Sequence, residues 1–574
     1  MKGLTMKRER LSVGGIVLCA VLWQTALLAA GIEGRVYLDV NRNGQPDTQE
    51  PGVAHVAVSD GLRVAVTDAE GRYKLDTSGT SALVWVSVPR DHAAHGSFWQ
   101  TAAGKSRLDF GLDACPQTDD FSFIQITDSH IGRADLLKQF AEHVGRLPIP
   151  IAFVINTGDL VGGVDVVLPE KAQWQYDRYI AAATFRTPLF NVPGNHEHVS
   201  HNVKEADTSH PLYGKGLYPR LLGPMHYSWD WAGVHCVALD GTTLPYQERL
   251  GTNQLTWLAA DLKVQPAGKP ILLFCHQSLP SLRDAKELSE ILRGRNVLGA
   301  FCGHLHQTFA TSFAGFPVYH SGALSGAWWG GPNIDGTPQG YRLVRIKGGA
   351  LKTVFTNREG MCPVSIVSPL ATSAQSGTFE AEVAVVDFGK PAEVTASFCG
   401  QPVTLAQTSR EELWSFWRGT VDTRQAFDGA RALEVTAKQG GTTNVFAILY
   451  LVSNGLAEPF TADAAATLRL QVRGISAPDV VLLNGEPLGT IPASTSNETS
   501  LAFAIGKERL GRLNRVTVRA AAQGKGKDQF SIGPVALEYK GKRIHDLRYA
   551  SFERHVIVGD DTERCEKDLY YSLP

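Results

Sequence analysis

Residues 121–130, FSFIQITDSH, join an apolar strand-like run to a polar cluster, Asp128-Ser-His130, at its end. Further apolar runs lead in the same way into Gly158-Asp159, Gly194-Asn195-His196-Glu197, His276 and Gly303-His304-Leu-His306. Strands that are apolar throughout are typical of a sheet covered on both faces. Helix-like stretches alternate with these strands at residues 134–147, 171–184, 252–263 and 284–293. This alternation predicts an α/β domain over residues 117–352.

The five clusters share one kind of chemistry. Together they supply eight Asp, Asn and His side chains, which can hold two metal ions and leave one imidazole over. Each cluster follows a strand, and open α/β sheets bind their ligands at the carboxyl ends of strands. Imidazole and carboxylate without thiolate suit Mn, Fe, Zn or Co, whereas a calcium site would not use so many histidines. A single Asp-x-His is more often a plain polar strand end, but the joint pattern predicts a metal-dependent hydrolase.

In this order, the clusters resemble the motifs of the calcineurin-like metallophosphoesterases over residues 119–350. The resemblance implies a catalytic β-sandwich flanked by helices, and it implies a role for each matching residue. One metal would be held by Asp128, His130 and His306, and the other by Asn195, His276 and His304, with Asp159 bridging the two. His196 would lie beside the metals without binding them.

The resemblance also implies the hydrolysis of phosphate esters. Two metal ions about 3.5–4 Å apart would clamp the phosphate, and a hydroxide bridging them would attack phosphorus in line. His196 would donate a proton to the leaving oxygen. Gly162 stands where purple acid phosphatases place an iron-binding Tyr, and the loop lacks the Arg of protein Ser/Thr phosphatases, so both subfamilies are disfavoured.

The ligand set is common to phosphomonoesterases and phosphodiesterases, so the expected substrate is a phosphate-ester small molecule or a phosphorylated glycan or nucleotide. A Gly-rich segment with Trp328 and Trp329 resembles exported bacterial members of the family with flanking β-domains. The two rings could stack on a sugar or base, or they could pack against the next domain. The alternative function is a surface protein that binds phosphoglycans or nucleotides without turnover. His196 argues against it, because a binding protein needs no acid.

A second metal-like pattern lies near the N-terminus. Oxygen-bearing side chains occupy the spacing of an EF-hand calcium loop at Asp39, Asn41, Asn43, Asp47 and Glu50, with Gly44 at the turn. The pattern resembles the calcium-binding B-type repeats of bacterial surface proteins, because it lies among β-like runs. Calcium would make this surface loop rigid; the alternative is a polar turn that binds nothing.

The first thirty residues predict export. Lys2, Lys7, Arg8 and Arg10 precede a mostly apolar run from Leu11 to Leu28, and small residues follow at 29–31. This order is typical of a signal peptide over residues 1–30 and predicts a periplasmic or secreted protein. An uncleaved anchor is the alternative, and only then would the chain contact a membrane.

The flanking regions are predicted to be all-β. Residues 31–116 carry short β-forming runs split by turns, which indicates an N-terminal β-sandwich. Residues 353–441 and 442–574 suggest two C-terminal β-sandwich modules, the second resembling a jelly roll, with the boundary at Gly440-Gly441. The net charge of −2 offers no electrostatic footprint for nucleic acid. Cys236, Cys275 and Cys302 lie in apolar runs and are predicted to be buried rather than metal-binding.

Overall fold

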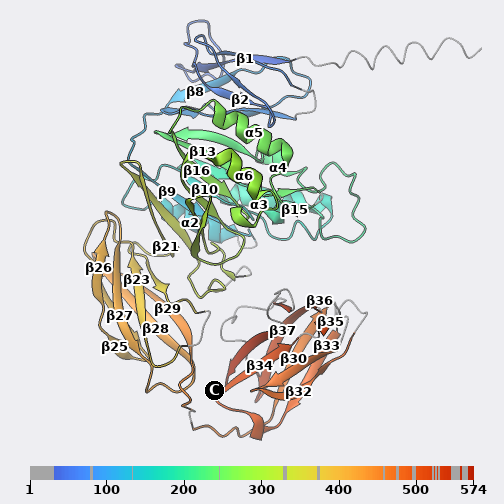
Figure 1. Cartoon of the computed structure of the whole chain (residues 1–574), viewed down its shortest axis with the longest axis vertical. Helices are drawn as coiled ribbons and strands as arrows, with labels where there is room; N and C mark the ends of the chain where they lie inside the picture. Colours follow the sequence, from blue (N-terminus) through green and yellow to red (C-terminus); the bar gives the residue numbers. More distant parts are fainter. Residues whose placement is uncertain are drawn as a thin grey trace, which may run out of the picture.

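The computed structural model describes residues 31–573 apart from short gaps. The gaps are residues 78–81, 132–133, 245, 328–331, 372–374, 457–458, 474–477, 494–498, 520–521, 524–525, 528–529, 545–555 and 559–565. The predicted signal peptide and the Trp328-Trp329 pair therefore lie outside the described residues. Four β-rich units follow one another along the chain, from the blue N-terminal unit to the red C-terminal one (Figure 1). Within the described ranges, no helix has the length and apolar character needed to cross a membrane.

The N-terminal unit is a small β-sandwich of two four-stranded sheets. One sheet contains, in order, β4 (Arg72–Leu75), β1 (Ile32–Leu38), β8 (Phe110–Ala114) and β6 (His92–Ala94). The other contains β3 (Val64–Val66), β2 (Ala57–Ser59), β5 (Leu83–Val86) and β7 (Trp99–Thr101). Alternate residues such as Val36, Val58 and Val84 fill the core between the sheets. The predicted all-β fold of this region is confirmed.

The central unit is a β-sandwich of a five-stranded and a six-stranded sheet. The first has the order β11 (Leu189–Asn191), β10 (Val154–Asn156), β9 (Phe121–Ile126), β20 (Gly340–Lys347) and β21 (Ala350–Asn357). The second has the order β12 (Tyr227–Trp231), β13 (Val234–Leu239), β16 (Pro270–Cys275), β17 (Asn296–Cys302), β19 (Phe316–His320) and β18 (Phe309–Phe313). The strands β9, β10 and β11 run parallel, as do β13, β16, β17 and β19.

Helices cover the outer faces of this sandwich. α2 (Ala134–Val144) and α3 (Pro169–Ala182) share a core with the five-stranded sheet, whereas α5 (Thr252–Lys263) and α6 (Ala285–Leu292) share one with the six-stranded sheet. The connections between these strands and helices contain five short elements. They are α4 (Tyr218–Leu221), β14 (Thr242–Thr243), β15 (Gln247–Glu248), η1 (Asn195–Glu197) and η2 (Leu279–Ser281). Every residue of β9 and of β13 is buried, which explains why these strands are mostly apolar. The predicted sandwich flanked by helices is confirmed.

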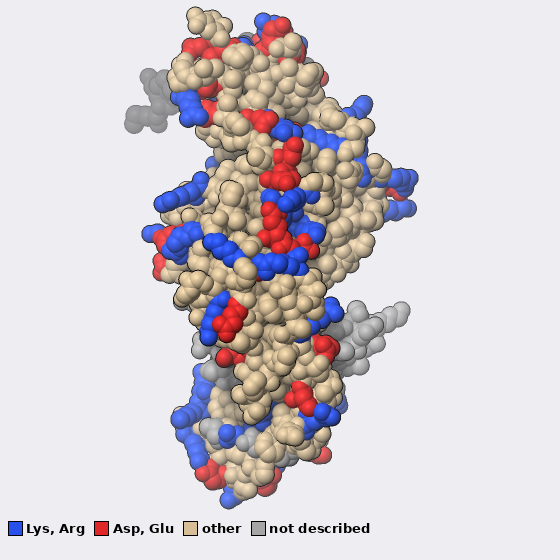
Figure 2. Space-filling model, turned by 90° about the vertical axis from the view of Figure 1, so that its left-hand side faces the viewer, with Lys and Arg blue, Asp and Glu red and all other residues tan. Residues whose placement is uncertain are grey.

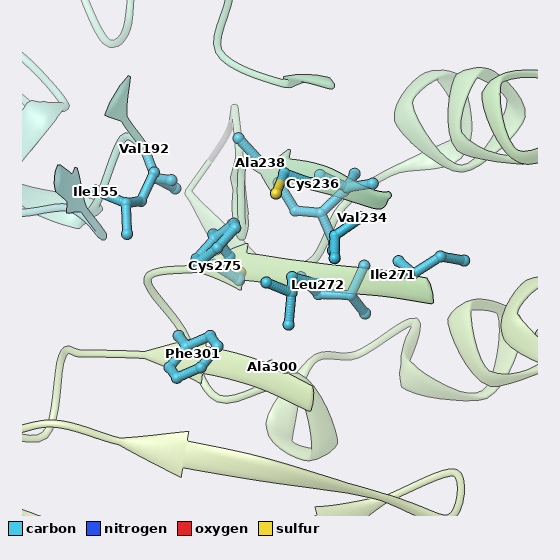
Figure 3. Packing of buried hydrophobic residues seen from close by; sticks show 14 of the residues in the cluster. Ile155, Val192, Val234, Cys236, Ala238, Ile271, Leu272, Cys275, Ala300 and Phe301 are labelled. Atoms are coloured by element: carbon cyan, nitrogen blue, oxygen red, sulfur yellow. The ribbon is translucent and has the colours of Figure 1, made fainter. Parts of the chain in front are cut away.

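The three central cysteines belong to this hydrophobic core. Figure 3 shows Cys236 on β13 and Cys275 on β16 among aliphatic side chains such as Leu272. Cys302 on β17 is also fully buried. Burial raises the pKa of all three thiols, so they stay protonated and pack as small apolar groups, as predicted.

The first C-terminal unit is a β-sandwich, and some of its residues pack into a hydrophobic core of the central unit. Its sheets contain β22 (Val364–Ser368), β23 (Thr378–Val385), β27 (Ser415–Asp422) and β26 (Ala406–Arg410), and β25 (Gln401–Val403), β24 (Glu393–Phe398), β28 (Gly429–Gln439) and β29 (Thr442–Val452). Phe388, Leu413 and Trp414 join the buried cluster that contains α2 and α3. Arg345 and Lys347 of β20 also pair with Glu412 at 3.2 and 3.1 Å. Basic and acidic side chains lie next to one another on the face shown in Figure 2.

The second C-terminal unit is a further β-sandwich. One sheet has the order β33 (Thr499–Ile505), β30 (Ala466–Arg473), β37 (Phe530–Tyr539) and β38 (Lys542–Ile544), with β39 (Val556–Val558) also on β37. The other has β32 (Glu486–Ile491), β31 (Asp479–Leu483), β34 (Leu513–Arg519) and β40 (Glu566–Ser572), and β35 (Ala522–Gln523) pairs with β36 (Gly526–Lys527). The short 3-10 turn η4 (Lys507–Arg509) lies between β33 and β34.

Two domain boundaries differ from the predicted ones. β28 and β29 form a hairpin in register from Gly429–Val452 to Gln439–Thr442, so the boundary at 441/442 would cut it. Gly440 and Gly441 have positive φ angles of 53° and 82° and form the turn of this hairpin rather than a linker. The first sandwich therefore extends to Val452. Likewise, β21 crosses the boundary at 352/353, because it pairs along its length with β20.

A buried ionic cluster connects β12, β13 and α5. His235 is fully buried, with Nδ1 2.8 Å from Asp230 Oδ1 and Nε2 2.8 Å from Asp261 Oδ2. Burial opposes the positive charge on His235, but the two carboxylates outweigh burial and raise the pKa of His235 to about 9. Lys269 Nζ adds a hydrogen bond of 2.7 Å to Asp230.

This cluster makes the stability of the central unit depend on pH. The pKa of His235 is raised from 6.5 to about 9, so its stabilising charge is complete below pH 6.5 and is lost as the pH rises to 9. We expect the free energy of unfolding of the wild-type protein to fall by about 3 kcal/mol over this interval relative to a His235→Gln variant. Urea denaturation of both proteins between pH 6 and 9 measures the difference, and parallel profiles would contradict it.

Candidate metal centre

The five polar clusters converge at the carboxyl ends of strands from both central sheets. Ligand atoms of three residue groups lie within 4.8 Å of one another: Asp128, His130 and His306; Asp159, His276 and His304; and His130, Asp159 and His196. The first group matches the set that the resemblance implies for one metal. The second matches the other set together with the bridging Asp159. Asn195 lies close to the second group, because its Oδ1 accepts a 3.4 Å hydrogen bond from Gln277, the residue after His276.

The backbone at these positions is unusual. Asp128, His130, Asp159, His304 and His306 all have positive φ angles, between 38° and 70°. Residues other than glycine rarely adopt this left-handed backbone conformation. It persists where the surrounding structure enforces it, often at functional sites. The sharp turns after the strands thus direct the five side chains toward a common point.

Two glycines in the motifs are required by close packing. A Cβ atom on Gly158, whose φ is 101°, would lie 2.6 Å from His276 Nδ1. A Cβ atom on Gly303 would lie 1.8 Å from Thr127 Oγ1 and 2.6 Å from Asp128 Oδ2. Each glycine therefore allows a predicted ligand to pack directly against the neighbouring loop.

The electrostatics of the site call for positive charge. Asp128 and Asp159 are 0% and 2% exposed, and buried carboxylates are costly unless paired. Burial alone would raise the pKa of Asp128, but His306 and His276 hold it well below its usual range. Burial opposes the charge on His276, yet Asp159 and Asp128 raise its pKa to about 10. In the protein alone a proton on His276 supplies this charge, and metal cations could supply it instead.

The donor atoms fit metal ions. Asp128 Oδ1 and His276 Nε2 are buried and make no hydrogen bond within the described part of the chain. His306 Nε2 comes within 3.0 Å of Asp128 Oδ1, and His276 Nε2 within 3.1 Å of Asp159 Oδ2. Thr157 O accepts a hydrogen bond from His276 Nδ1 at 2.8 Å, which leaves Nε2 as the ligating atom. Burial lowers the pKa of His130 to about 4, so this imidazole is in the neutral form that binds metals.

Glu197 holds the two loops that carry Asp159 and Asn195. Its carboxylate accepts hydrogen bonds from the backbone N–H groups of Asp159, Leu160, Val161 and Gly194 at 3.1, 2.8, 3.2 and 2.5 Å. Burial and the Asp159 carboxylate raise the pKa of Glu197 to about 7, against the effect of these N–H groups. Glu197 lies in a predicted motif, but the sequence indicates no role for it, because three of its partners lie 36 to 38 residues away.

His196 lies beside the predicted ligands with a carboxylate behind it. Its Nδ1 is 3.2 Å from Asp165 Oδ1, and its Nε2 is 4.0 Å from Asp159 Oδ2. Asn202 Nδ2 donates to the other oxygen of Asp165 at 2.7 Å. Burial opposes the charge on His196, but Asp159, Asp165 and Glu197 outweigh it and raise the pKa to about 9. Asp165 was not identified from the sequence, because nothing in its local pattern links it to His196.

The side chains of the predicted calcium loop also lie close together, but they accept hydrogen bonds from the loop itself, mostly from its backbone. Asp39 accepts hydrogen bonds from the N–H groups of Asn43 and Gly44 at 3.1 and 2.8 Å. Glu50 accepts a hydrogen bond from the backbone N–H of Val40 at 2.9 Å. Asp47 Oδ2 accepts hydrogen bonds from the side-chain amides of Asn41 and Asn43 at 2.7 and 2.9 Å. Calcium binding here stays a prediction.

Comparison with known proteins agrees with this geometry. Residues 121–308 match the family model for calcineurin-like phosphoesterase, and residues 40–114 match the model for the N-terminal domain of calcineurin-like phosphoesterase. A cAMP/cGMP dual specificity phosphodiesterase of Mycobacterium tuberculosis is 25% identical over 255 residues, which are 40% of this chain and 76% of that protein. A probable cyclic nucleotide phosphodiesterase of Rhodococcus erythropolis is 30% identical over 105 residues, 17% of this chain and 35% of that protein.

Among solved structures, an uncharacterized protein of Streptococcus pneumoniae described as a predicted phosphoesterase is 14% identical, with a TM-score of 0.22. The match covers 42% of this chain and 90% of that one, and at this score it supports no conclusion. The family models, together with the site geometry, confirm the predicted family and class of enzyme. Residues 121–308 thus carry a calcineurin-like phosphoesterase domain, and that family consists of metal-dependent enzymes that hydrolyse phosphate esters.

Proposed function

We propose that the chain is an exported phosphodiesterase with a dinuclear metal centre. The observation that carries this proposal is the pair of ligand groups, Asp128 with His130 and His306, and Asp159 with His276 and His304. Asp159 belongs to the second group and also to the third, with His130 and His196, so its carboxylate would be shared if two cations were bound. When bound, two metal ions would lower the pKa of a water nucleophile and neutralise the phosphate.

The protein side chains perform the remaining tasks. His196 holds a proton at Nε2, which is directed toward the predicted ligands, and can donate it to the leaving oxygen. Asp165 accepts a hydrogen bond from Nδ1 and keeps the imidazole in this orientation. Asn195 would bind the second metal through its side-chain oxygen, next to His276. The surrounding burial limits competing water and strengthens each of these interactions.

A small phosphodiester of the nucleotide type is the substrate class that we propose. Two relatives bear names that describe cyclic nucleotide phosphodiesterases, and one of them matches over 76% of its own length. Export is part of the proposal because residues 1–30 have the composition of a signal peptide. The protein would then act in the periplasm or outside the cell.

The function can be tested with a substrate panel on the chelated full-length protein. Bis(p-nitrophenyl) phosphate, p-nitrophenyl phosphate and 3′,5′-cyclic AMP would be offered with Mn²⁺, Zn²⁺, Fe²⁺ or Co²⁺, with metal content measured in parallel. We expect added metal to restore hydrolysis and the diesters to be preferred. Binding of metal and cyclic AMP without any turnover would instead support a binding protein and overturn the proposal.

A His196→Gln variant should separate proton donation from metal binding. For cyclic AMP, whose leaving oxygen needs a proton, we expect kcat to fall on the order of 10²-fold. For bis(p-nitrophenyl) phosphate the loss should be much smaller, because p-nitrophenolate is a weak base that leaves without help. Kinetics on both substrates measure this ratio, with Asp165→Asn as a milder variant and His210→Gln as the control. An equal loss on both substrates would contradict the role of His196 as an acid.

A further inference from the structure

The hairpin of β14 and β15 brings a carboxylate to the edge of the metal centre. Glu248 pairs with Thr242 across this hairpin, and its backbone oxygen accepts a hydrogen bond of 3.0 Å from Arg283 N. Its Oε1 lies 3.6 Å from His304 Nε2, with the two side chains 37% and 29% exposed. This distance is an ion-pair contact and is longer than a hydrogen bond.

A neighbouring tyrosine supports this carboxylate. Burial, the nearby charges of Glu248 and Asp159, and the interaction with the Glu248 side chain raise the pKa of Tyr246. The hydroxyl beside Glu248 therefore stays protonated. The Tyr246 ring lies 4.6 Å from the ring of His201 and 5.4 Å from that of His198. His198 in turn contacts Thr242 Oγ1 at 2.9 Å, so the hairpin is anchored at both ends.

The orientation of His304 has a chemical consequence. Its Nε2 lies toward Glu248, so Nδ1 would be the nitrogen that joins Asp159 and His276 around a cation. Histidines that bind metals usually donate their second N–H to a carboxylate, which sets the tautomer and makes the ligating nitrogen more basic. His276 has such a partner in Thr157 O, and Glu248 is the corresponding group for His304.

We propose that Glu248, which lies beside the Tyr246 hydroxyl, is a positioning residue that fixes His304 for binding of the second metal. The inference rests on the metal centre of the proposed function. It extends that function because it assigns β14 and β15 to the metal centre, although neither Glu248 nor Tyr246 lies in one of the five motif clusters.

Titration of the chelated protein with Mn²⁺ alone tests the proposal without any substrate. We expect two equivalents to bind to the wild type, and one of them to bind about 10–100-fold more weakly in a Glu248→Ala variant. A Glu248→Gln variant keeps an acceptor for the N–H and should recover part of the affinity, and Tyr246→Phe should lose a smaller part. The electron paramagnetic resonance signal of Mn²⁺ should change from a coupled pair to a single ion at limiting metal.

The outcomes separate this inference from the proposed function. Glu287→Gln, an exposed carboxylate on α6, is the control and should bind both equivalents as the wild type does. If the wild type itself binds fewer than two equivalents, the dinuclear centre is wrong. If the wild type binds two and Glu248→Ala binds them with the same affinities, only the role of Glu248 is overturned. Circular dichroism of each variant confirms that the fold is intact, and the Glu248→Gln recovery distinguishes positioning from a general loss of structure.

Discussion

Replacement of Asp159 by asparagine is expected to lower kcat/KM for a phosphodiester by on the order of 10³-fold or more. Asparagine keeps the size of the side chain but removes the negative charge that two cations would share. It also weakens the acceptor for the His196 backbone N–H, which is 2.9 Å from Asp159 Oδ1. Steady-state kinetics with the metal content measured on the same samples check this result, and we expect less than two equivalents of bound metal.

The control for this substitution is Asp177→Asn, an exposed position on α3. It makes the same chemical change away from the site and should leave both kinetics and metal content unchanged. Wild-type turnover in Asp159→Asn would rule out the metal centre as the seat of catalysis.

A Glu197→Gln variant is expected to lower the free energy of unfolding of the metal-free protein by about 3–5 kcal/mol. Each oxygen of Glu197 accepts two backbone N–H groups, Leu160 and Val161 on one, Asp159 and Gly194 on the other. A glutamine amide can accept on one side only, so two buried N–H groups would face an NH₂ group and lose their acceptor. Urea denaturation after chelation measures the difference.

This substitution should also weaken metal binding, because Asp159 and Asn195 lie on the loops that Glu197 joins. Glu142→Gln, which changes an exposed residue of α2, is the matched control and should have little effect on stability. A loss of less than 1 kcal/mol in Glu197→Gln would mean that the four N–H groups find water or other acceptors.

Local patterns were enough to locate the four main helices of the central unit and the strands that lead into the polar clusters. The segment 252–263 is a helix over the same residues, and the apolar runs around Phe274 and Phe301 are buried strands. Such strands can be predicted from the sequence because a strand that is buried on both faces is a nearly continuous apolar run. The boundary at Gly440-Gly441 was wrong for the opposite reason: a hairpin turn and a linker use the same residues, and only the pairing of β28 with β29 distinguishes them.

Some residues of the candidate site could likewise be predicted from the sequence, and others could be found only in the structure. The predicted metal ligands and His196 were identifiable from the sequence, since metal chemistry requires imidazole and carboxylate groups and strand ends present them. Asp165, the four donors to Glu197, and Glu248 beside His304 became visible only in the fold. Apart from Gly194, which is three residues from Glu197, these partners lie from 31 to 56 residues apart along the chain, and the way the chain folds decides which side chains meet. The sequence thus predicted the ligands and their class of chemistry, and the tertiary structure decided how these side chains are oriented, charged and held.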